Sequence, residues 1–394
     1  MKTLKNIEWI KNHHQALSPF GKGKPTLANL QEMFYGKEGS IYIHIPYCLK
    51  ICKFCILIKK PGKPNPKYVD TLLKELSMYE NYKVVRSLYF GGGTPTLLSV
   101  EEFERILTFI QERFGKPEET TVETTVTEFN KEKAECLSSL GVNRLSFGVQ
   151  TFNESERYLL GRRRSIKEVI KKIKLAKDYF KIVAIDLLYD LPYGNFLLDD
   201  VKKAVELGIN GISIYPLVYN KSMKNYPHPD VKKNERDFIE AYNFLKENGY
   251  SHLSINHFSD GTDKFLSSSS FTAALSLLGI GCGAAGHVEN ISFFHIPIPY
   301  LYSRGIFQIV KTKTPEEVLK GKKFISQLFN GVLVFNDFSV EDFKESVSLA
   351  LSNEWAELNG KKLTLLPKGL FWKHNLAHAM AKEFLNKWNN RYEK

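Results

Sequence analysis

The sequence lacks three features that mark common classes of protein. No uninterrupted apolar run is long enough to cross a membrane, since the apolar stretch at residues 291–302 contains a histidine and two prolines. The chain begins with a polar segment, residues 1–15, that has no apolar core of a secretion signal. Five cysteines in 394 residues are too few for a disulfide framework and fit a reducing compartment. These absences predict a soluble, cytoplasmic protein without a membrane span.

Acidic residues are also in deficit, because 43 aspartates and glutamates face 55 lysines and arginines and leave a formal charge of +12. Such an excess can favour an anionic partner, for example a small molecule with carboxylates, an anionic lipid or a nucleic acid. No run of lysines or arginines is dense enough to mark a nucleic-acid surface, so a solvated, lysine-rich surface is the simpler interpretation. Nucleic acid is therefore not expected as a partner.

Apolar strands and amphipathic helices alternate through the first half of the chain. The predicted strands lie at residues 41–45, 84–90, 120–126, 144–150, 181–191 and 211–217. Two of the helices between them have a capping box, formed by Ser99 with Glu102 and by Ser165 with Glu168. Strands separated by helices, without a tandem repeat, predict a parallel α/β sheet. Right-handed crossovers place the strand ends on one side of such a sheet, where functional sites collect.

The pattern becomes less regular beyond about residue 220. There the sequence predicts a helix at 233–248, a strand at 252–258, a polar loop at 260–270 and a small-residue segment at 277–286. A compact helical domain follows, with helices near 315–329, 339–352 and 369–389. A hairpin at 355–366, turning at Asn359-Gly360, lies between the last two helices and makes the domain winged-helix-like.

Three of the five cysteines, Cys48, Cys52 and Cys55, follow directly on the first predicted strand, which Pro46 ends. Three thiolates on one short loop can converge on a single inorganic centre. A zinc site normally takes four protein ligands, and a cubane iron–sulfur cluster held by four cysteines is equally closed. Three cysteines leave one iron of such a cluster open to an outside molecule. The alternatives are unligated thiols or an incomplete zinc site, but the C-x3-C-x2-C spacing after a strand favours the cluster.

Several motifs, in the same order, resemble one known family. They are the strand and cysteine loop at 42–55, the Gly-Gly-Gly-Thr-Pro-Thr run at 91–96, and the segments 143–152, 160–162 and 186–192. Over about residues 40–220 the chain resembles the oxygen-independent coproporphyrinogen III oxidase-like (HemN-like) family of radical S-adenosylmethionine (SAM) proteins. The resemblance implies a partial (β/α)6 radical SAM barrel and a C-terminal, mainly helical, winged-helix-like domain. We expect an N-terminal arm, a barrel with its extension and a C-terminal domain at 1–39, 40–310 and 311–394.

The resemblance also implies roles for individual residues, each carried over at a matching position. Cys48, Cys52 and Cys55 would ligate a [4Fe-4S] cluster and leave one iron to SAM. One or two SAM molecules would be held by glycines and polar side chains, namely Tyr42, Gly92, Gly93, Thr94, Glu123, Gln150, Arg162 and Asp186.

Further roles are implied for small and catalytic residues. Gly281, Gly283 and Ala284 would leave room for a second SAM or a flat macrocycle, and Tyr42 and His44 are the predicted catalytic residues. Elementary chemistry agrees with such roles, because glycines let a backbone approach a ligand. An arginine can also fork onto a carboxylate.

Plainer interpretations stand beside these roles. The glycine run at 91–93 could be only a turn, and the small residues at 281–284 could serve only close backbone packing. Glu123 or Asp186 could be part of a structural ion pair. Arg162 could be a surface arginine.

The chain departs from the two best-known branches of the family. Oxidases often carry a fourth cysteine two positions after the third, where this chain has Leu57. The heme-chaperone branch carries a His-Asn…Tyr-Trp motif where this chain has residues 264–271. The segments 253–258 and 281–287 are more similar to the radical SAM methyltransferases of the family, one branch of which opens the heme ring anaerobically.

The remaining histidines and cysteines are less informative. His257 and His287 could ligate heme iron or move protons, but a single histidine is more often only hydrogen-bonded. Cys136 and Cys282 are expected in the core.

The sequence therefore predicts a radical SAM enzyme that cleaves SAM at a [4Fe-4S] cluster and acts on a tetrapyrrole or another large conjugated substrate, with radical methyl transfer as one form of the chemistry. Its partners would be that small molecule and an electron donor such as flavodoxin or ferredoxin. The alternatives are an oxygen-independent coproporphyrinogen III oxidase and a non-catalytic heme chaperone. From another class, the net charge and the wing suggest a zinc-stapled nucleic-acid-binding protein.

Overall fold

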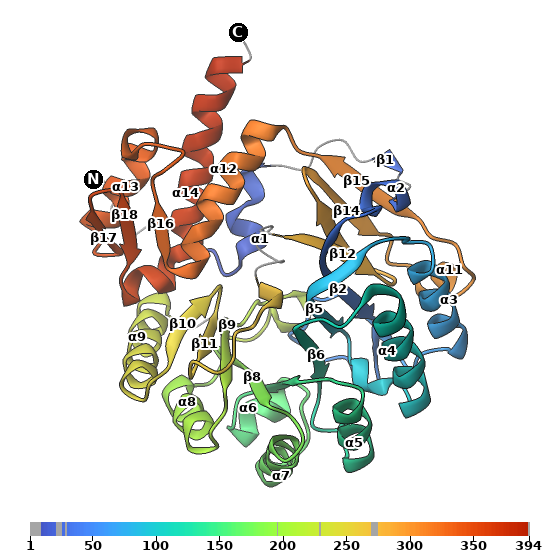
Figure 1. The fold of residues 1–394 in the computed structure, drawn as a ribbon. Helices are drawn as coiled ribbons and strands as arrows, with labels where there is room; N and C mark the ends of the chain where they lie inside the picture. The colour runs from blue at the N-terminus through green and yellow to red at the C-terminus, as the bar shows by residue number, and fades with distance from the viewer. Residues whose placement is uncertain are drawn as a thin grey trace.

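The computed structural model describes residues 9–20, 26–27, 30–194, 196–227, 230–268 and 275–392. Within them, a sheet of thirteen strands curves into an open barrel with helices outside it, and a smaller domain packs against one side (Figure 1). No helix in these ranges is both long and apolar enough to span a bilayer.

The centre of the sheet is parallel, as the sequence predicts. In the order of pairing, its strands are β2 (Glu38–Ile45), β5 (Lys83–Gly92), β6 (Glu119–Thr124), β7 (Arg144–Gln150), β8 (Ile182–Tyr189) and β9 (Gly211–Pro216). The helices around the outside are α3 (Pro66–Leu76), α4 (Val100–Phe114), α5 (Lys131–Ser139), α7 (Ile166–Lys177), α8 (Leu197–Glu206) and α9 (Val231–Glu247) (Figure 1). The predicted partial (β/α)6 barrel is confirmed.

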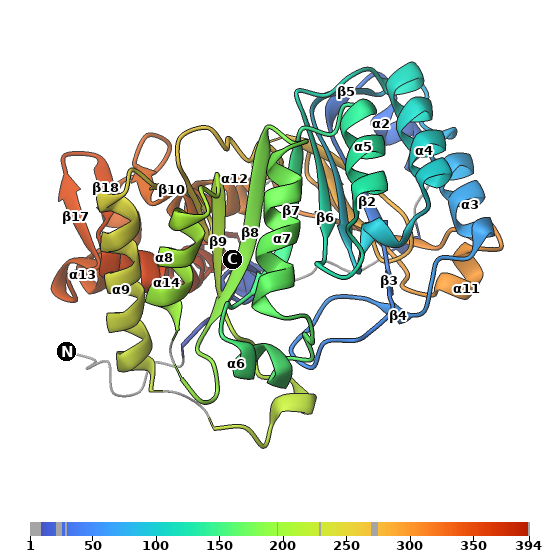
Figure 2. The ribbon, with the colours of Figure 1, turned by 90° about the horizontal axis from the view of Figure 1, so that it is seen from below.

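Local sequence explains where these elements begin. Both predicted capping boxes form, since the Ser99 and Ser165 side chains accept from the backbone N–H groups of Glu102 and Glu168. The cysteine loop follows β2 and is closed by the short parallel pair of β3 (Tyr47–Cys48) and β4 (Lys60–Pro61). This pair lies on the same side of the barrel as the short helix α6 (Glu154–Leu159), which follows β7 (Figure 2). Both mark the mouth of the barrel, the side at which the parallel strands end.

Both edges of the sheet extend beyond this centre. β12 (Ser276–Ile280) pairs in parallel with β2. Beyond it lie, each antiparallel to the last, β13 (Ala285–Val288), β14 (Ile291–His295), β15 (Ile309–Lys313) and β1 (Thr26–Leu27), with α11 (Pro299–Tyr302) between β14 and β15. At the other edge, β11 (His257–Ser259) pairs with β9 and then with β10 (Ser251–Ser254).

The small-residue segment at 277–286 contains most of β12 and the start of β13, two strands that the sequence analysis did not predict. Glycines weaken a strand signal, but here Gly279 allows close strand packing, because a Cβ at this position would lie 2.7 Å from the carbonyl carbon of Ala285.

The C-terminal domain is mainly helical, as predicted. Its helices are α12 (Glu316–Ser326), α13 (Lys344–Ser352) and α14 (Pro367–Tyr392), and its small sheet is made of β16 (Val332–Val334), β17 (Ala356–Asn359) and β18 (Lys362–Leu365). The predicted hairpin forms, with Gly360 in the left-handed conformation at its turn. No pattern in the sequence predicts β16, which is three residues long.

The first part of the N-terminal arm lies between the barrel and the C-terminal domain, whereas its later part lies at the edge of the sheet formed by β15 (Figure 1). The arm includes α1 (His13–Ala16) and α2 (Gln31–Phe34), besides β1. Trp9 stacks on Phe371 of α14 at 4.8 Å between ring centroids, and Lys11 forms an ion pair with Asp190 at the end of β8. The arm therefore ties α14 to the barrel mouth.

Candidate active site

The cysteine loop is held against two other segments of the barrel mouth. The backbone N–H of Lys53 donates to the carbonyl of Leu160 at 3.4 Å. Asn220 Nδ2 donates to the carbonyl of Lys53 at 2.7 Å. Since Leu160 follows α6 and Asn220 follows β9, these bonds join three loops on the side where the parallel strands end.

The three cysteines of this loop, Cys48, Cys52 and Cys55, are free thiols and are partly exposed. Burial raises the pKa of Cys48 and of Cys52, while the positive charge of Arg162 acts in the opposite direction on both. The charge of Cys55 also raises the pKa of the other two thiols, because it lies near them. Thiols must lose a proton to bind a metal, and a neighbouring guanidinium favours that loss.

As a donor set, three cysteine thiols on one loop suit an iron–sulfur cluster, which cysteine thiolates hold. Among the residues that the structure describes, no three histidine, cysteine, aspartate or glutamate side chains are gathered as the ligands of one metal ion. A structural zinc ion binds its four ligands in one tetrahedral sphere. In a cubane cluster each cysteine binds a different iron, so that the ligands stand further apart.

Arg162, Gln150 and Gly148 meet beside the cysteine loop. A Cβ at Gly148 would lie 2.9 Å from Gln150 Nε2 and 3.3 Å from Arg162 Nη2, so the glycine makes room for both side chains. Gln150 has a φ of +75°, at the point where β7 ends with a shift of register. Arg162 Nε is buried and has no acceptor within the described ranges. An unused guanidinium donor next to the cysteines suits a ligand with a carboxylate.

Two carboxylates lie inside the barrel below the loop, on strands β6 and β8. Glu123 accepts from the Tyr89 hydroxyl at 2.7 Å and from the backbone N–H of Gly92 at 3.3 Å. Burial raises the pKa of Glu123 to about 7, and the negative charge of Asp186 adds to the shift. Burial also raises the pKa of Asp186 to about 6, although Arg144 opposes the shift. Enclosed carboxylates with pKa values near neutrality are typical of functional sites.

Tyr42 and His44 on β2 form a hydrogen-bonded pair next to these carboxylates. His44 Nε2 lies 3.2 Å from the Ile58 carbonyl oxygen, which can only accept, so Nε2 carries the proton. The other nitrogen, Nδ1, then accepts from the Tyr42 hydroxyl at 2.9 Å. Burial lowers the pKa of His44 to about 4, so the ring is neutral at pH 7.

The glycine run at the end of β5 packs directly on this pair and on the cysteine loop. A Cβ at Gly92 would lie 2.6 Å from the His44 ring, and one at Gly93 would lie 2.9 Å from the Ile45 carbonyl oxygen. Thr94 Oγ1 is 3.6 Å from Cys48 Sγ. Any side chain at Gly92 or Gly93 would therefore displace β2 or the cysteine loop.

The small residues after β12 lie on the other side of β2. A Cβ at Gly281 would lie 2.6 Å from the His44 carbonyl oxygen, and one at Gly283 would lie 3.0 Å from the Ile58 side chain. Ala284 is buried, and its backbone N–H donates to the Gly281 carbonyl. These contacts favour close backbone packing at all three positions. A role in binding a second SAM or a macrocycle stays a prediction.

The other histidines and cysteines follow their plainer interpretations. His287 Nε2 bonds to the Leu275 carbonyl oxygen at 2.6 Å, and His257 bonds to Ser213 and to an aspartate. Cys282 is fully buried, as expected, whereas Cys136 is only partly so.

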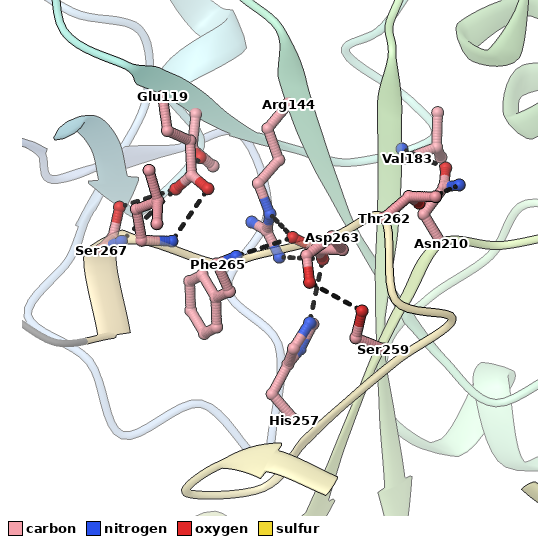
Figure 3. Close-up of polar contacts among 12 residues, drawn as sticks. Glu119, Arg144, Val183, Asn210, His257, Ser259, Thr262, Asp263, Phe265 and Ser267 are labelled. Carbon is pink, nitrogen blue, oxygen red and sulfur yellow. Dashed lines mark hydrogen bonds and ion pairs between the residues drawn. The ribbon is translucent and has the colours of Figure 1, made fainter. Parts of the chain in front are cut away.

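The sequence analysis did not predict a buried ion pair at the barrel floor. The barrel floor is the side where the parallel strands begin, and residues 260–268 cross it. Arg144 Nε and Nη2 each donate to one carboxylate oxygen of Asp263 at 3.0 Å (Figure 3). Phe265 covers the guanidinium at 4.3 Å, and Glu119 accepts from the backbone N–H of Leu266 at 2.9 Å. An arginine inside an apolar strand does predict an acidic partner, but nothing in the sequence identifies Asp263 as that partner.

Comparison with known proteins shows which family this chain belongs to. The model of the radical SAM superfamily matches residues 42–197. The heme chaperone HemW of Lactococcus lactis is 30% identical over 377 residues, which are 91% of this chain and 97% of the relative. Anaerobilin synthase of Escherichia coli is 27% identical over 278 residues, or 65% of this chain and 62% of that protein.

The structural comparison agrees. The structure of coproporphyrinogen III oxidase (HemN) from Escherichia coli superposes with a TM-score of 0.76, covering 96% of this chain and 99% of that one at 21% identity, which shows a shared fold. The chain therefore belongs to the HemN-like family of radical SAM proteins, whose cofactors are a [4Fe-4S] cluster and SAM.

Proposed function

We propose that this chain cleaves SAM reductively at a [4Fe-4S] cluster bound by Cys48, Cys52 and Cys55, and that it acts on a tetrapyrrole or another large conjugated molecule. The observation that carries the proposal is the meeting of three groups at the barrel mouth. They are the cysteine loop, the guanidinium of Arg162 beside it, whose Nε is buried, and the carboxylate of Asp186 inside the barrel. Family membership supplies the cofactors.

Each of these residues is proposed to bind a different part of SAM. Arg162 Nε, which has no acceptor among the described residues, can donate to the methionine carboxylate. Glu123 and Asp186 can accept from the amine or from the ribose hydroxyls, and Gln150 lies next to Arg162 at the same end of the barrel. The backbone at Gly92 and Gly93 leaves no side chain in the way. When bound, the cluster supplies the electron that cleaves SAM, and the chain supplies position and exclusion of water.

The pair of Tyr42 and His44 is proposed to shape the site beside SAM. His44 is neutral and both of its nitrogens have partners, so it has no proton to give at neutral pH without breaking a hydrogen bond. It therefore acts as a rigid support for the Tyr42 hydroxyl and for Gly92, against which its ring packs.

Heme binding without turnover is the second candidate function. The observation that favours it is the extent of the similarity to the Lactococcus lactis heme chaperone, which covers nearly all of both chains. If the chain is an enzyme that acts on a tetrapyrrole, the reaction would be either transfer of a methyl group to the tetrapyrrole or oxidation of the tetrapyrrole. The electron donor of this enzyme is proposed to be a small redox protein such as flavodoxin or ferredoxin.

Anaerobic reconstitution with iron and sulfide, followed by dithionite and SAM, tests the first proposal. We expect about four irons per chain and the formation of 5′-deoxyadenosine. Cys52→Ala should abolish both cluster binding and cleavage, whereas Cys136→Ala, which alters a cysteine far from the loop, should leave both unchanged. Full iron content and SAM cleavage in the Cys52→Ala variant would contradict the assignment.

Two additions to this assay decide between the candidates. SAM labelled in its methyl group is incubated with a porphyrin, and label in the product indicates methyl transfer, whereas an unlabelled, altered porphyrin indicates oxidation. Heme is titrated into the protein and followed by absorbance. Stable heme binding without any SAM cleavage would favour the chaperone and overturn the enzymatic proposal.

A further inference from the structure

The cysteine loop exposes several large apolar side chains to solvent. Leu49, Ile51, Ile56 and Leu57 are 48%, 41%, 57% and 52% exposed. Each of the three cysteines has one of these residues as its direct neighbour in sequence. A single exposed apolar residue needs no explanation, but four on one short loop are typical of an interaction surface.

The backbone of this loop is held in place. Lys59 Nζ donates to the carbonyl oxygens of Cys55 and Leu57. At its two ends the loop is closed by the parallel pair of β3 and β4. The apolar side chains are therefore exposed on a loop whose course is fixed by hydrogen bonds.

The charged side chains of this part of the chain are all positive. Residues 39–69 contain six lysines and no aspartate or glutamate. Five of these lysines are exposed, namely Lys50, Lys53, Lys60, Lys63 and Lys67. In the part of the chain that the structure describes, none of the six forms an ion pair, although Glu128 lies near Lys63. Their charges can therefore attract a negatively charged partner.

Aromatic side chains extend this surface onto neighbouring loops. Lys53 Nζ donates to the Tyr226 hydroxyl at 3.0 Å, and the Tyr226 ring meets the Tyr193 ring edge-on at 6.2 Å between centroids. On α6, the Tyr158 ring lies 5.7 Å from the Arg163 guanidinium. Tyr158 and Tyr193 are each 65% exposed.

These exposed groups share one side of the barrel. Figure 2 shows α6 on the same side as the pair of β3 and β4, where the parallel strands end. We use the name mouth surface for the exposed side chains of residues 49–57 together with Tyr158, Arg163 and Tyr193. It combines apolar and aromatic groups with positive charges, directly over the residues that carry the cysteines.

We propose that the mouth surface is the docking site of the protein that reduces the cluster, and that this partner is a small acidic flavoprotein. The proposal rests on the proposed function, because only a redox-active cluster needs such a partner. Carboxylates around the partner's flavin would pair with the exposed lysines. The apolar dimethylbenzene edge of the flavin would pack on the aliphatic side chains, since interfaces combine an apolar centre with a polar rim.

One electron crosses this interface in each reduction. The anionic hydroquinone of the flavin loses one electron and keeps its protons, while the oxidised cluster gains that electron. No bond forms or breaks between the two proteins. A flavin edge packed on Leu49, Ile51 or Ile56 lies next to a residue that carries a cluster ligand. Glu123 and Asp186, proposed to hold SAM, are on strands inside the barrel and are not part of the mouth surface.

The rate of 5′-deoxyadenosine formation by the reconstituted holoprotein tests the charged part of this surface. Each variant is assayed with flavodoxin reduced to the hydroquinone and, separately, with excess dithionite. The ratio of the two rates is compared, so that any effect on cluster loading cancels. In Lys50→Glu with Lys53→Glu this ratio should fall at least about tenfold at low ionic strength, because two attractive charges become repulsive.

The matched control makes the same change of charge on the outer helix α7. In Lys171→Glu with Lys174→Glu, two exposed positions away from the cysteine loop, the ratio should equal that of the wild type. An unchanged ratio in the Lys50 and Lys53 variant, or an equal loss in the α7 variant, would overturn the proposal.

Ile51→Ser with Ile56→Ser tests the apolar part of the surface. The dissociation constant for oxidised flavodoxin, measured by titration calorimetry, should rise at least about tenfold, and an unchanged constant would overturn the proposal. Tighter binding of a ferredoxin than of flavodoxin would overturn the choice of a flavoprotein. Phosphatidylglycerol vesicles identify a membrane surface instead, if these variants abolish vesicle binding while flavodoxin binding persists, and that result would also overturn the proposal.

A measurement on the wild type serves if the loop variants do not take up a cluster. Flavodoxin should slow amide hydrogen exchange in residues 49–57 and 158–163 but not in α7, and unchanged exchange in both segments would overturn the docking site. Binding and exchange are measured on the oxidised holoprotein and need no turnover. Absence of 5′-deoxyadenosine with dithionite would refute the proposed function, while these two measurements would still decide the docking site.

Discussion

Replacement of Asp263 by Asn should destabilise the protein strongly, because it leaves a buried guanidinium without its counter-charge. The Arg144 and Asp263 side chains are 2% and 0% exposed, and two hydrogen bonds of 3.0 Å join them. Breaking such a pair from one side costs about 3–5 kcal/mol, most of it from the uncompensated charge. We therefore expect the free energy of unfolding to fall by about that amount at pH 7.

The exposed ion pair of Arg105 and Asp70 provides the matched control. Its N–O distance is 2.7 Å, but its side chains are 50% and 60% exposed. Asp70→Asn should therefore change stability by less than about 1 kcal/mol. Urea unfolding at 25 °C measures both variants against the wild type. Adding Arg144→Met to Asp263→Asn should recover part of the loss, since no unpaired charge then remains.

The pH dependence of the effect has a definite sign. The folded-state pKa of Asp263 is depressed below its ordinary value of 3.8, so its stabilisation is present above that value and is lost as the pH falls towards the folded pKa. The difference between the wild type and Asp263→Asn should thus be constant from pH 7 to 8, above the ordinary pKa of the neighbouring His257, and should shrink in strong acid as Asp263 takes up a proton. A loss below about 1 kcal/mol at pH 7 would refute the reasoning.

Three further predictions concern other parts of the molecule. Gly93→Ala should lower the iron content after reconstitution, measured by colorimetric assay, because its Cβ would press on the backbone that leads into the cysteine loop; full iron content would contradict this. In Glu123→Gln the free energy of unfolding should equal that of the wild type below pH 4.5 and exceed it by about 3 kcal/mol above pH 7. The reason is that burial raises the pKa of the Glu123 carboxyl from 4.5 to about 7, so its ionisation destabilises the folded wild type. Two curves of unfolding free energy against pH that run parallel would contradict this. Trp372→Ala should cost about 3–5 kcal/mol in urea unfolding, since the ring is buried and stacks on Trp355 at 5.5 Å, and a loss of under 1 kcal/mol would count against it.

Much of the barrel could be predicted because its strands are buried on both faces. Such strands appear in the sequence as mostly apolar runs, for example Ile182 to Tyr189, in which Asp186 is the one charged residue. Helix starts were equally clear, since the capping boxes at Ser99 and Ser165 are local signals. The cysteine spacing and the glycine run were also local, and the structure brings Thr94, at the end of that run, next to Cys48.

The rest depends on contacts between distant segments. Arg144 and Asp263 are separated by 119 positions, and the polar loop that carries Asp263 gives no indication that it crosses the barrel floor. β12 was missed because Gly279 lowers its strand signal, although the same glycine is what lets β13 approach. Ser213 is one small polar residue in an apolar strand. Its contact with His257 depends on the register of β9 with β11, which no local signal in the sequence predicts.

The most direct test of the account is the electron paramagnetic resonance spectrum of the reduced, reconstituted protein before and after SAM is added. A cluster held by Cys48, Cys52 and Cys55 has one iron open to SAM, so we predict a [4Fe-4S] signal that changes when SAM binds. A protein that contains zinc in place of iron, or a cluster signal that SAM leaves unchanged, would contradict the central claim.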